Sequence, residues 1–459
     1  MHKIWERILT SFSVTGLNLQ TLVNYKVLRE KYKFLKESQW WSKEELEKYQ
    51  MQELIILLNH AYENVPYYKK TFNKLGLKPE DVKSISDLNK LPFLTKDIIK
   101  ENLKELKAVN YPKTKFELSR TGGSTGQPLN FYVERGVTLS KLMAFAKLWM
   151  DWTDRSFFDR CVYITGEDEP FKYQLFGRTL VISSFFMNDN YMPIFIEKIR
   201  KLKPKHILGY PSAITNLAIY MKKNNIENFP SLRIIVCLAE TLNDLQRDLI
   251  EKFFKCRVHN QYGLRESAAL GGTCRDSNYF HMFSEFGIIE LIDKDGRQIT
   301  KEGQIGEIVG TSFINHIFPF IRYRTGDLGV YTFKKCKCGR NYPLLERIQG
   351  RLQELLVSKT NKLVNLIGLY GLIAKSSLNV KECQLYQDTP GQVIIKIVKG
   401  KNYSENDTKI ILKNFQKKLG NEFSFSVHFV DHISLTTRGK YKFLVQKLPI
   451  DFTQYIDPY

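Results

Sequence analysis

Residues 119–128 combine the residue types that bind phosphate. The segment reads SRTGGSTGQP, and its candidate contacts are Thr121, Gly122, Gly123, Ser124, Thr125 and Gly126. Glycine lets backbone N–H groups approach a ligand closely, and the hydroxyls add neutral hydrogen-bond donors for phosphate oxygens. The glycine spacing matches neither the nucleotide-triphosphatase loop nor the dinucleotide-binding loop. Taken alone, the segment predicts either a nucleotide phosphate loop or a solvated turn between two elements.

Four later phrases carry further groups that bind nucleotides, in an order that suits one large enzyme. They are Tyr262-Gly263-Leu264-Arg265-Glu266, Tyr323-Arg324-Thr325-Gly326-Asp327-Leu328, Gly350-Arg351 and Arg438-Gly439-Lys440. Together with residues 119–128, these phrases resemble the adenylate-forming superfamily, the acyl-CoA synthetases and their relatives. Within it, the chain is most similar to the phenylacetate-CoA ligase-like branch, including its members associated with capsular polysaccharide synthesis. The resemblance covers nearly the whole chain, from about residue 54 to about residue 445.

The resemblance implies a role for each phrase. The loop, with Thr125 as a catalytic hydroxyl, would hold the β- and γ-phosphates of ATP and the pyrophosphate that leaves. Tyr262 would stack on adenine. Glu266 would hold Mg²⁺, a hard cation that keeps several water ligands and therefore needs only one protein carboxylate. Asp327 would accept hydrogen bonds from both ribose hydroxyls, and Arg351 would contact the same ribose.

Two further residues are assigned by the resemblance, each with an alternative. Glu240 follows Ala239 and would border the adenine, although a surface charge at the start of a helix explains it equally well. Lys440 would bridge the reacting carboxylate and the α-phosphate, stabilising charge as the two anions approach. The alternative for Lys440 is an exposed lysine in a lysine-rich tail. Because Lys442 lies two residues later, it stays open which of the two lysines matches the family position.

Two glutamines depart from the family pattern. Gln127 stands where the phosphate loop usually carries lysine, and Gln353 stands where the hinge usually carries aspartate. These departures favour a second hypothesis, in which the chain is a non-catalytic nucleotide-binding or scaffold protein of polysaccharide assembly.

A second set of residues has metal-ligand chemistry: Cys274, His281, Cys336 and Cys338. Three thiols and one imidazole suit a tetrahedral structural zinc site, which leaves no ligand position open for substrate. Similar quartets occur in the phenylacetate-CoA ligase-like branch. We therefore predict structural Zn²⁺, with free buried cysteines as the alternative.

The segments that must position these groups predict an α/β protein, with a large N-terminal domain of layered sheets and helices and a small α+β C-terminal domain. The resemblance implies that the first is the adenylate-forming domain and the second its lid. Residues 1–110 read mostly as helix, with Pro66 as a stop signal and Thr95 as an N-cap. Residues 111–350 alternate short apolar runs with helical segments, and ligands of such sheets collect at the carboxyl ends of strands. Residues 351–459 read as strands around one helix, which predicts a small α+β domain, and the resemblance implies that this domain is mobile.

The acid substrate is expected to bind around Tyr210 and residues 237–264. Two apolar phrases, Phe157-Phe158 and Phe185-Phe186-Met187, fit either the wall of an aromatic-acid pocket or the core. A sugar or amino-acid carboxylate is the alternative substrate, because of the similarity to capsule-associated relatives.

The composition is that of a globular protein with a basic excess. The 459 residues include 69 Lys and Arg against 48 Asp and Glu, a net charge of +21. The basic residues are dispersed along the chain, which favours a protein that handles polyanionic nucleotides over one that binds nucleic acid or a membrane. The chain has no apolar run of about 18 residues and no secretory cleavage signal at its start. Seven scattered cysteines fit a reducing compartment.

These observations predict a cytoplasmic, Mg²⁺- and ATP-dependent ligase. It would join a small-molecule carboxylic acid to AMP, release pyrophosphate, and pass the acyl group to CoA, a carrier thiol or an amine. The small domain would swing between the two half-reactions. The choice between a monomer and a dimer stays open.

Overall fold

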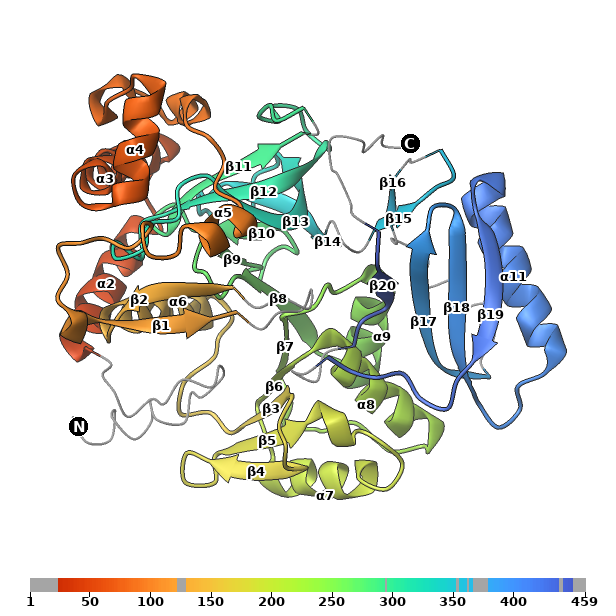
Figure 1. Ribbon diagram of the computed structural model, residues 1–459. Coiled ribbons are helices and arrows are strands. Elements are labelled where there is room, and N and C mark those ends of the chain that lie inside the picture. Colours follow the sequence, from red (N-terminus) through yellow and green to blue (C-terminus); the bar gives the residue numbers. More distant parts are fainter. Residues whose placement is uncertain are drawn as a thin grey trace.

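The chain folds into a large α/β part and a smaller α+β part, which confirms the predicted fold class (Figure 1). The computed structural model describes residues 24–121, 129–293, 295–351, 355–360, 363–365, 379–436 and 441–448.

The N-terminal region is helical as far as residue 101. Its helices are α2 (Tyr25–Ser38), α3 (Lys43–Asn64), α4 (Pro66–Leu75) and α5 (Lys96–Glu101), with the short 3₁₀ turns η1 (Pro79–Asp81) and η2 (Ile85–Lys90) between the last two. Pro66 ends α3 as predicted and is also the first residue of α4, a position where its missing N–H costs nothing. Thr95 caps α5 by accepting a hydrogen bond from the Ile98 N–H, which confirms the predicted N-cap.

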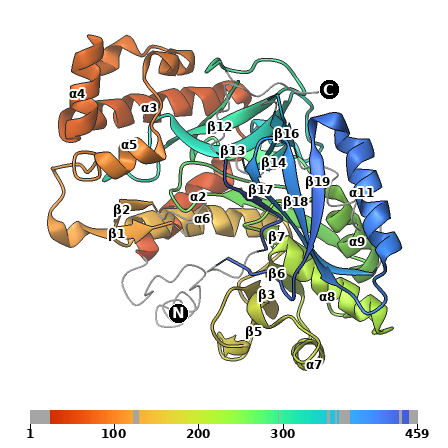
Figure 2. The ribbon, with the colours of Figure 1, turned by 45° about the vertical axis from the view of Figure 1, so that its right-hand side comes forward.

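A two-stranded sheet flanks the glycine-rich loop. After η3 (Lys113–Lys115), β1 (Phe116–Arg120) pairs antiparallel with β2 (Asn130–Glu134), and α6 (Val137–Trp152) follows. Residues 122–128, which join the two strands, lie outside the described residues. In both views α2 lies beside α6 (Figures 1 and 2).

Most strands of the large part join one sheet, in which twelve described strands run in the order β11-β12-β13-β14-β10-β9-β8-β7-β6-β3-β5-β4. Its parallel half contains β3 (Cys161–Thr165), β5 (Thr179–Ser183), β6 (His206–Gly209), β7 (Ile234–Leu238) and β8 (Arg257–Gly263), with β4 (Phe171–Gln174) as an antiparallel edge. The connecting elements are η4 (Ser184–Phe186), α7 (Met192–Leu202), α8 (Pro211–Lys223) and α9 (Asp244–Phe254). The apolar faces of these helices pack against the strands in one buried cluster.

The antiparallel half of the sheet completes the large part. It contains β9 (Leu270–Gly272), β10 (Phe280–Met282), β11 (Gly287–Ile292), β12 (Ile305–Ser312), β13 (Tyr323–Thr332) and β14 (Leu344–Arg351). β8 joins the two halves, because it pairs parallel with β7 and antiparallel with β9. The ends of β7 and β8 therefore lie where the sheet changes direction, which is where open α/β sheets bind ligands.

The C-terminal part has its own sheet and core. A pair of short strands, β15 (Leu355–Val357) and β16 (Leu363–Asn365), precedes a four-stranded sheet of β17 (Val380–Thr389), β18 (Gln392–Lys399), β19 (Ser424–Phe429) and β20 (Leu444–Gln446). Helix α11 (Glu405–Leu419) and the turn η6 (Gly420–Glu422) connect β18 to β19. Ile411 and Phe415 of α11 are fully buried against the sheet, so this part has a hydrophobic core separate from the large one. Figure 1 shows it beside the large part.

Within the described part of the chain, no helix is both long enough and apolar enough to cross a membrane.

Candidate active site

A pocket opens at the carboxyl ends of β7 and β8. Residues after these strands and from β13 and β14 line it, and the described ones are Ala239, Glu240, Thr241, Leu242, Asn260, Gln261, Tyr262, Gly263, Leu264, Phe280, Asp327, Ile348 and Gly350. Three predicted site residues, Glu240, Tyr262 and Asp327, therefore share one pocket although up to 87 positions separate them.

Two tyrosine–carboxylate hydrogen bonds cross between β8 and β13. The Tyr262 hydroxyl donates to Asp327 Oδ2 over 2.9 Å, and the Tyr323 hydroxyl donates to Glu266 Oε1 over 3.0 Å. All four side chains are buried. Tyr262 of β8 thus holds Asp327 of β13, and Tyr323 of β13 holds Glu266, which follows β8. The positions of Glu266 and Asp327 are therefore coupled. Tyr323 is the first residue of the selected phrase, but sequence reasoning gave it no role; its hydroxyl holds the predicted Mg²⁺ ligand.

A tight turn places Asp327 at the pocket. The Thr325 hydroxyl donates to the Ile308 carbonyl over 2.7 Å and accepts from the Asp327 N–H over 3.0 Å. Gly326 has φ of 75°, a left-handed value that favours glycine, and its N–H donates to Glu307 Oε1. These bonds explain the Thr-Gly-Asp order: threonine and glycine build the turn that presents the carboxylate.

The two arginines that flank Tyr323 anchor the strand rather than line the pocket. Arg322 forms a buried pair with Glu290 and donates to the Leu91 carbonyl over 2.6 Å, while its guanidinium lies over the Phe93 ring. Arg324 pairs with Glu307. These contacts tie the segment before α5 to the start of β13.

Glu240 connects the pocket to the C-terminal part. Its Oε2 accepts from the Ser212 N–H at the start of α8, over 3.1 Å. Its Oε1 accepts from the backbone N–H of Tyr441, over 2.9 Å. Position 441 follows Lys440 directly, so the residue after this lysine is held at the pocket. This bond could not be predicted from local sequence, because 201 positions separate the two residues.

Several predicted residues lie outside the described part of the chain: Gly122, Gly123, Ser124, Thr125, Gly126 and Lys440. Thr121 is described, and its hydroxyl oxygen accepts from the Leu129 N–H over 2.8 Å at the base of the loop. Arg351 is described by its backbone, which lies opposite Asp327 in the β13–β14 register. The chain at position 351 therefore runs beside the predicted ribose carboxylate.

A second cavity, of about 570 Å³, lies between the large and the C-terminal parts. Phe185, Met187 and Ser212 line one side, and His432 and Tyr441 lie among the lining residues of the other. Of the two apolar phrases considered for the acid pocket, Phe185-Phe186-Met187 therefore contributes to a cavity wall. Phe158 does not line this cavity, and its side chain is 51% exposed.

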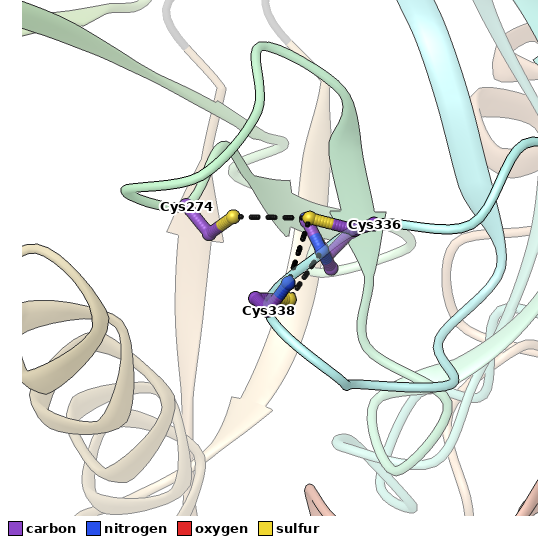
Figure 3. A group of neighbouring side chains, drawn as sticks. Cys274, Cys336 and Cys338 are labelled. Carbon is purple, nitrogen blue, oxygen red and sulfur yellow. Dashed lines mark hydrogen bonds between the residues drawn. The ribbon is translucent and has the colours of Figure 1, made fainter.

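The four predicted zinc ligands come together in space. Their ligand atoms lie within 4.8 Å of one another. Cys274 Sγ is 3.4 Å from Cys336 Sγ (Figure 3). His281 Nε2 is 3.2 Å from Cys338 Sγ. The contact with Cys274 lowers the pKa of the Cys338 thiol to about 7. One imidazole and three thiols within this span have the composition of a closed tetrahedral site.

Comparisons with known proteins found relatives in sequence and in fold. Residues 356–447 match the family described as the CapK C-terminal domain. The chain is 28% identical to protein CapK of Staphylococcus aureus over 410 residues, which cover 85% of this chain and 87% of CapK. It is 25% identical to a phenylacetate-coenzyme A ligase of Thermus thermophilus, with 69% of this chain and 72% of the ligase covered.

A solved structure shares the fold. It is that of 2-hydroxyisobutyryl-CoA ligase in the postadenylation state, with 17% identity, a TM-score of 0.71, and coverage of 90% of this chain and 93% of that one. These relatives support the predicted resemblance to the phenylacetate-CoA ligase-like branch and to CapK, and the solved structure shows that the chain shares the fold of an adenylate-forming ligase.

Proposed function

We propose that this protein activates a carboxylic acid with Mg·ATP as an acyl-adenylate and then transfers the acyl group to CoA or to another thiol or amine. The observation that carries the proposal is the pair of buried tyrosine–carboxylate bonds, which sets Glu266 and Asp327 in fixed positions beside one pocket. ATP provides the adenylyl group. The residues of the chain supply binding, orientation and charge stabilisation.

The described residues fit the nucleoside and the metal ion. Asp327 presents a carboxylate to ribose hydroxyls, and the Tyr262 ring borders the same pocket for the adenine. Tyr323 uses only Oε1 of Glu266, and no other hydrogen bond among the described residues takes Oε2. This oxygen is a suitable ligand for Mg²⁺, which prefers carboxylate and water oxygens.

The phosphate-binding and lysine roles rest on residues outside the described part of the chain. We assign the triphosphate to residues 121–126, between β1 and β2. We assign the bridge between acid and α-phosphate to Lys440, and the Glu240–Tyr441 bond supports this because it holds the neighbouring residue at the pocket. Release of that bond would let the C-terminal part move and admit the acyl acceptor.

The acid is proposed to be a sugar or amino-acid carboxylate used in surface polysaccharide synthesis. The relation to CapK supports this class, and the cavity of about 570 Å³ between the two parts is large enough for either. An aromatic acid, as implied by the name of the phenylacetate-CoA ligases, is the alternative.

Acid-dependent exchange of labelled pyrophosphate into ATP tests the proposal. A panel of sugar, amino and aromatic acids should contain at least one that drives exchange, because adenylation is reversible. The scaffold alternative, favoured by Gln127 and Gln353, predicts that no acid does so. In a matched test, Lys440→Ala should lose exchange while still transferring the acyl group from supplied acyl-adenylate, and Lys442→Ala should keep both activities.

We also propose that the cysteine–histidine cluster holds structural Zn²⁺. The four ligand atoms would fix the turn between β9 and β10 to the segment before β14. The purified protein should contain one zinc per chain, and Cys338→Ala should lose it. Metal analysis that finds no stoichiometric metal would contradict the assignment.

A further inference from the structure

A cavity of about 620 Å³ lies at the amino ends of the parallel strands, on the edge of the sheet opposite the nucleotide pocket. It is lined by the first residue of each of three strands, His206 of β6, Ile234 of β7 and Arg257 of β8. The nucleotide pocket lies beyond the other ends of β7 and β8. Six residue steps separate Arg257 from Gly263, so the two sites are about 20 Å apart at ~3.3 Å per residue.

The cavity gathers positive charge from distant parts of the sequence. Its cationic lining residues are Arg155, Lys205, Arg233, Arg257 and Arg275, and its only carboxylates among the described lining residues are Asp154 and Asp159. Lys205 pairs with Asp159 over 2.8 Å, which leaves four arginines against one carboxylate. A concave surface with this excess attracts multivalent anions.

Three buried side chains of the wall have hydrogen-bonding atoms that the described residues leave unpartnered. Arg155 is 6% exposed, with Nε bonded to the Thr153 hydroxyl and the guanidinium over the Trp149 ring, but its Nη2 has no partner. The Nδ1 atoms of His206 and His259, which are 3% and 2% exposed, also make no hydrogen bond with a described residue, and His206 Nδ1 lies 4.0 Å from Asp159 Oδ2. Buried polar atoms are rarely left without hydrogen-bond partners. Because other contacts already fix the Arg155 guanidinium, its unpartnered N–H group is positioned to donate to a bound anion.

The two histidines add hydrogen bonds rather than charge. Burial, followed by the neighbouring Arg155, lowers the pKa of His206 to about 4 and that of His259 to about 3. Both rings are therefore neutral near pH 7, and the positive charge of the cavity comes from its arginines.

Two exposed arginines complete the rim. Arg233 and Arg275 line the cavity, and neither makes a side-chain hydrogen bond or ion pair with a described residue. Helix N-termini supply much of the anion binding at the carboxyl edge of such sheets, whereas the carboxyl ends of α7 and α9 lie near β6 and β8 at this edge. Anion binding here must come from side chains, and the arginines supply it.

We propose that this cavity, at the amino ends of β6, β7 and β8, is a second ligand site that binds a small molecule carrying a diphosphate group. Arginines bind phosphate oxygens through paired N–H groups, and four of them suit two adjacent phosphates better than one. The volume leaves room for an organic group beside the diphosphate. The ligand class is therefore inorganic pyrophosphate or a nucleoside diphosphate, bound independently of the acid-activating chemistry.

Calorimetric titration of the full chain with pyrophosphate and with UDP, at constant ionic strength, tests the site. Arg233→Glu/Arg275→Glu should weaken pyrophosphate binding at least tenfold. Lys222→Glu/Lys223→Glu, at the exposed end of α8, makes the same change in charge and should leave it intact. Tighter binding of UDP than of pyrophosphate would identify a nucleoside diphosphate as the ligand, and equal or weaker binding would identify free pyrophosphate.

The nucleotide pocket would also bind pyrophosphate, so binding there must be distinguished experimentally from binding in this cavity. Ser124→Ala/Thr125→Ala should leave the arginine-dependent binding unchanged. Binding that falls in this loop variant but is intact in the arginine variant would overturn the proposal, and so would wild-type binding no stronger than that of chloride.

Arg233→Gln/Arg275→Gln provides a milder pair. If the arginines only stabilise helix ends, these variants will lower the melting temperature without changing pyrophosphate affinity.

Discussion

The two edges of the parallel strands have opposite charge. At the carboxyl edge, the described lining residues include Glu240 and Asp327 and neither lysine nor arginine. At the amino edge, four arginines and a lysine surround a cavity with two carboxylates. The same strands therefore support two sites with different ligand preferences.

Helix direction explains this difference. The helices that follow β6 and β7 begin near the carboxyl edge, where backbone N–H groups and the helix dipole favour phosphate. Carboxylates at that edge can then serve the ribose and a metal ion. The amino edge lacks this backbone contribution, so an anion site there requires basic side chains, and it has them.

The first prediction has the largest expected effect and concerns a substitution that should impair the carboxyl edge without changing the amino edge. Asp327→Ala removes the carboxylate proposed to accept both ribose hydroxyls, and each charged hydrogen bond contributes about 1.5–3 kcal/mol. Pyrophosphate–ATP exchange should fall roughly a thousandfold, while pyrophosphate binding at the amino edge stays unchanged. Asp295→Asn, at an exposed pair with Arg297, is the control and should keep full activity. Exchange within threefold of wild type would refute the ribose role.

The second prediction uses pH. His206 faces Asp159, Lys205 and Arg155, and His259 faces Arg155, Arg247 and Arg257. Because both folded-state pKa values lie below the usual 6.5, the unfolded chain binds more protons between about pH 6.5 and 4, and stability falls as pH falls through this window.

Denaturant unfolding at pH 7 and pH 4 measures this loss. The contribution from His206 should be roughly 3 kcal/mol by pH 4, since each pKa unit corresponds to about 1.4 kcal/mol. His206→Asn should flatten the pH dependence of the free energy of unfolding. Pyrophosphate should also flatten it, because protonated histidines would attract the bound anion. An unchanged slope in the variant would show that other groups cause the acid sensitivity.

The third prediction concerns the tyrosine that holds Glu266. Tyr323→Phe leaves a buried carboxylate oxygen without its donor, which costs about 1–3 kcal/mol. Exchange should fall about tenfold at low Mg²⁺ and recover at high Mg²⁺, because the displaced carboxylate binds the ion more weakly. Tyr331→Phe, on the same strand, is the matched control. A defect that added Mg²⁺ does not relieve would make Tyr323 a packing residue only.

Local phrases selected three residues that line one pocket at the carboxyl edge, namely Glu240, Tyr262 and Asp327, and did not indicate the cavity at the amino edge. Tyr262 and Glu266 share one short phrase with Gly263, Asp327 follows Thr325 and Gly326, and the predicted zinc ligands are recognisable because cysteine is scarce. The cationic cavity takes one residue each from positions 155, 205, 233, 257 and 275. Dispersed basic residues looked like general surface charge, and only strand register brings them together. The Tyr323–Glu266 and Glu240–Tyr441 bonds were missed for a related reason, since 57 and 201 positions separate their partners.

The prediction with the smallest expected effect tests whether Glu240 holds the C-terminal part at the carboxyl edge. Glu240→Gln keeps one acceptor oxygen but replaces the other with an N–H₂ group, so one of the bonds to Ser212 and Tyr441 is lost. A neutral hydrogen bond contributes about 0.5–1.5 kcal/mol, so exchange should fall about threefold. Transfer from supplied acyl-adenylate should be unchanged, because that half-reaction requires the C-terminal part to move away. Asp244→Asn, an exposed substitution at the start of α9, should affect neither half-reaction. An equal fall in both half-reactions would mean that Glu240 acts on the nucleotide alone and does not hold the segment that carries Lys440.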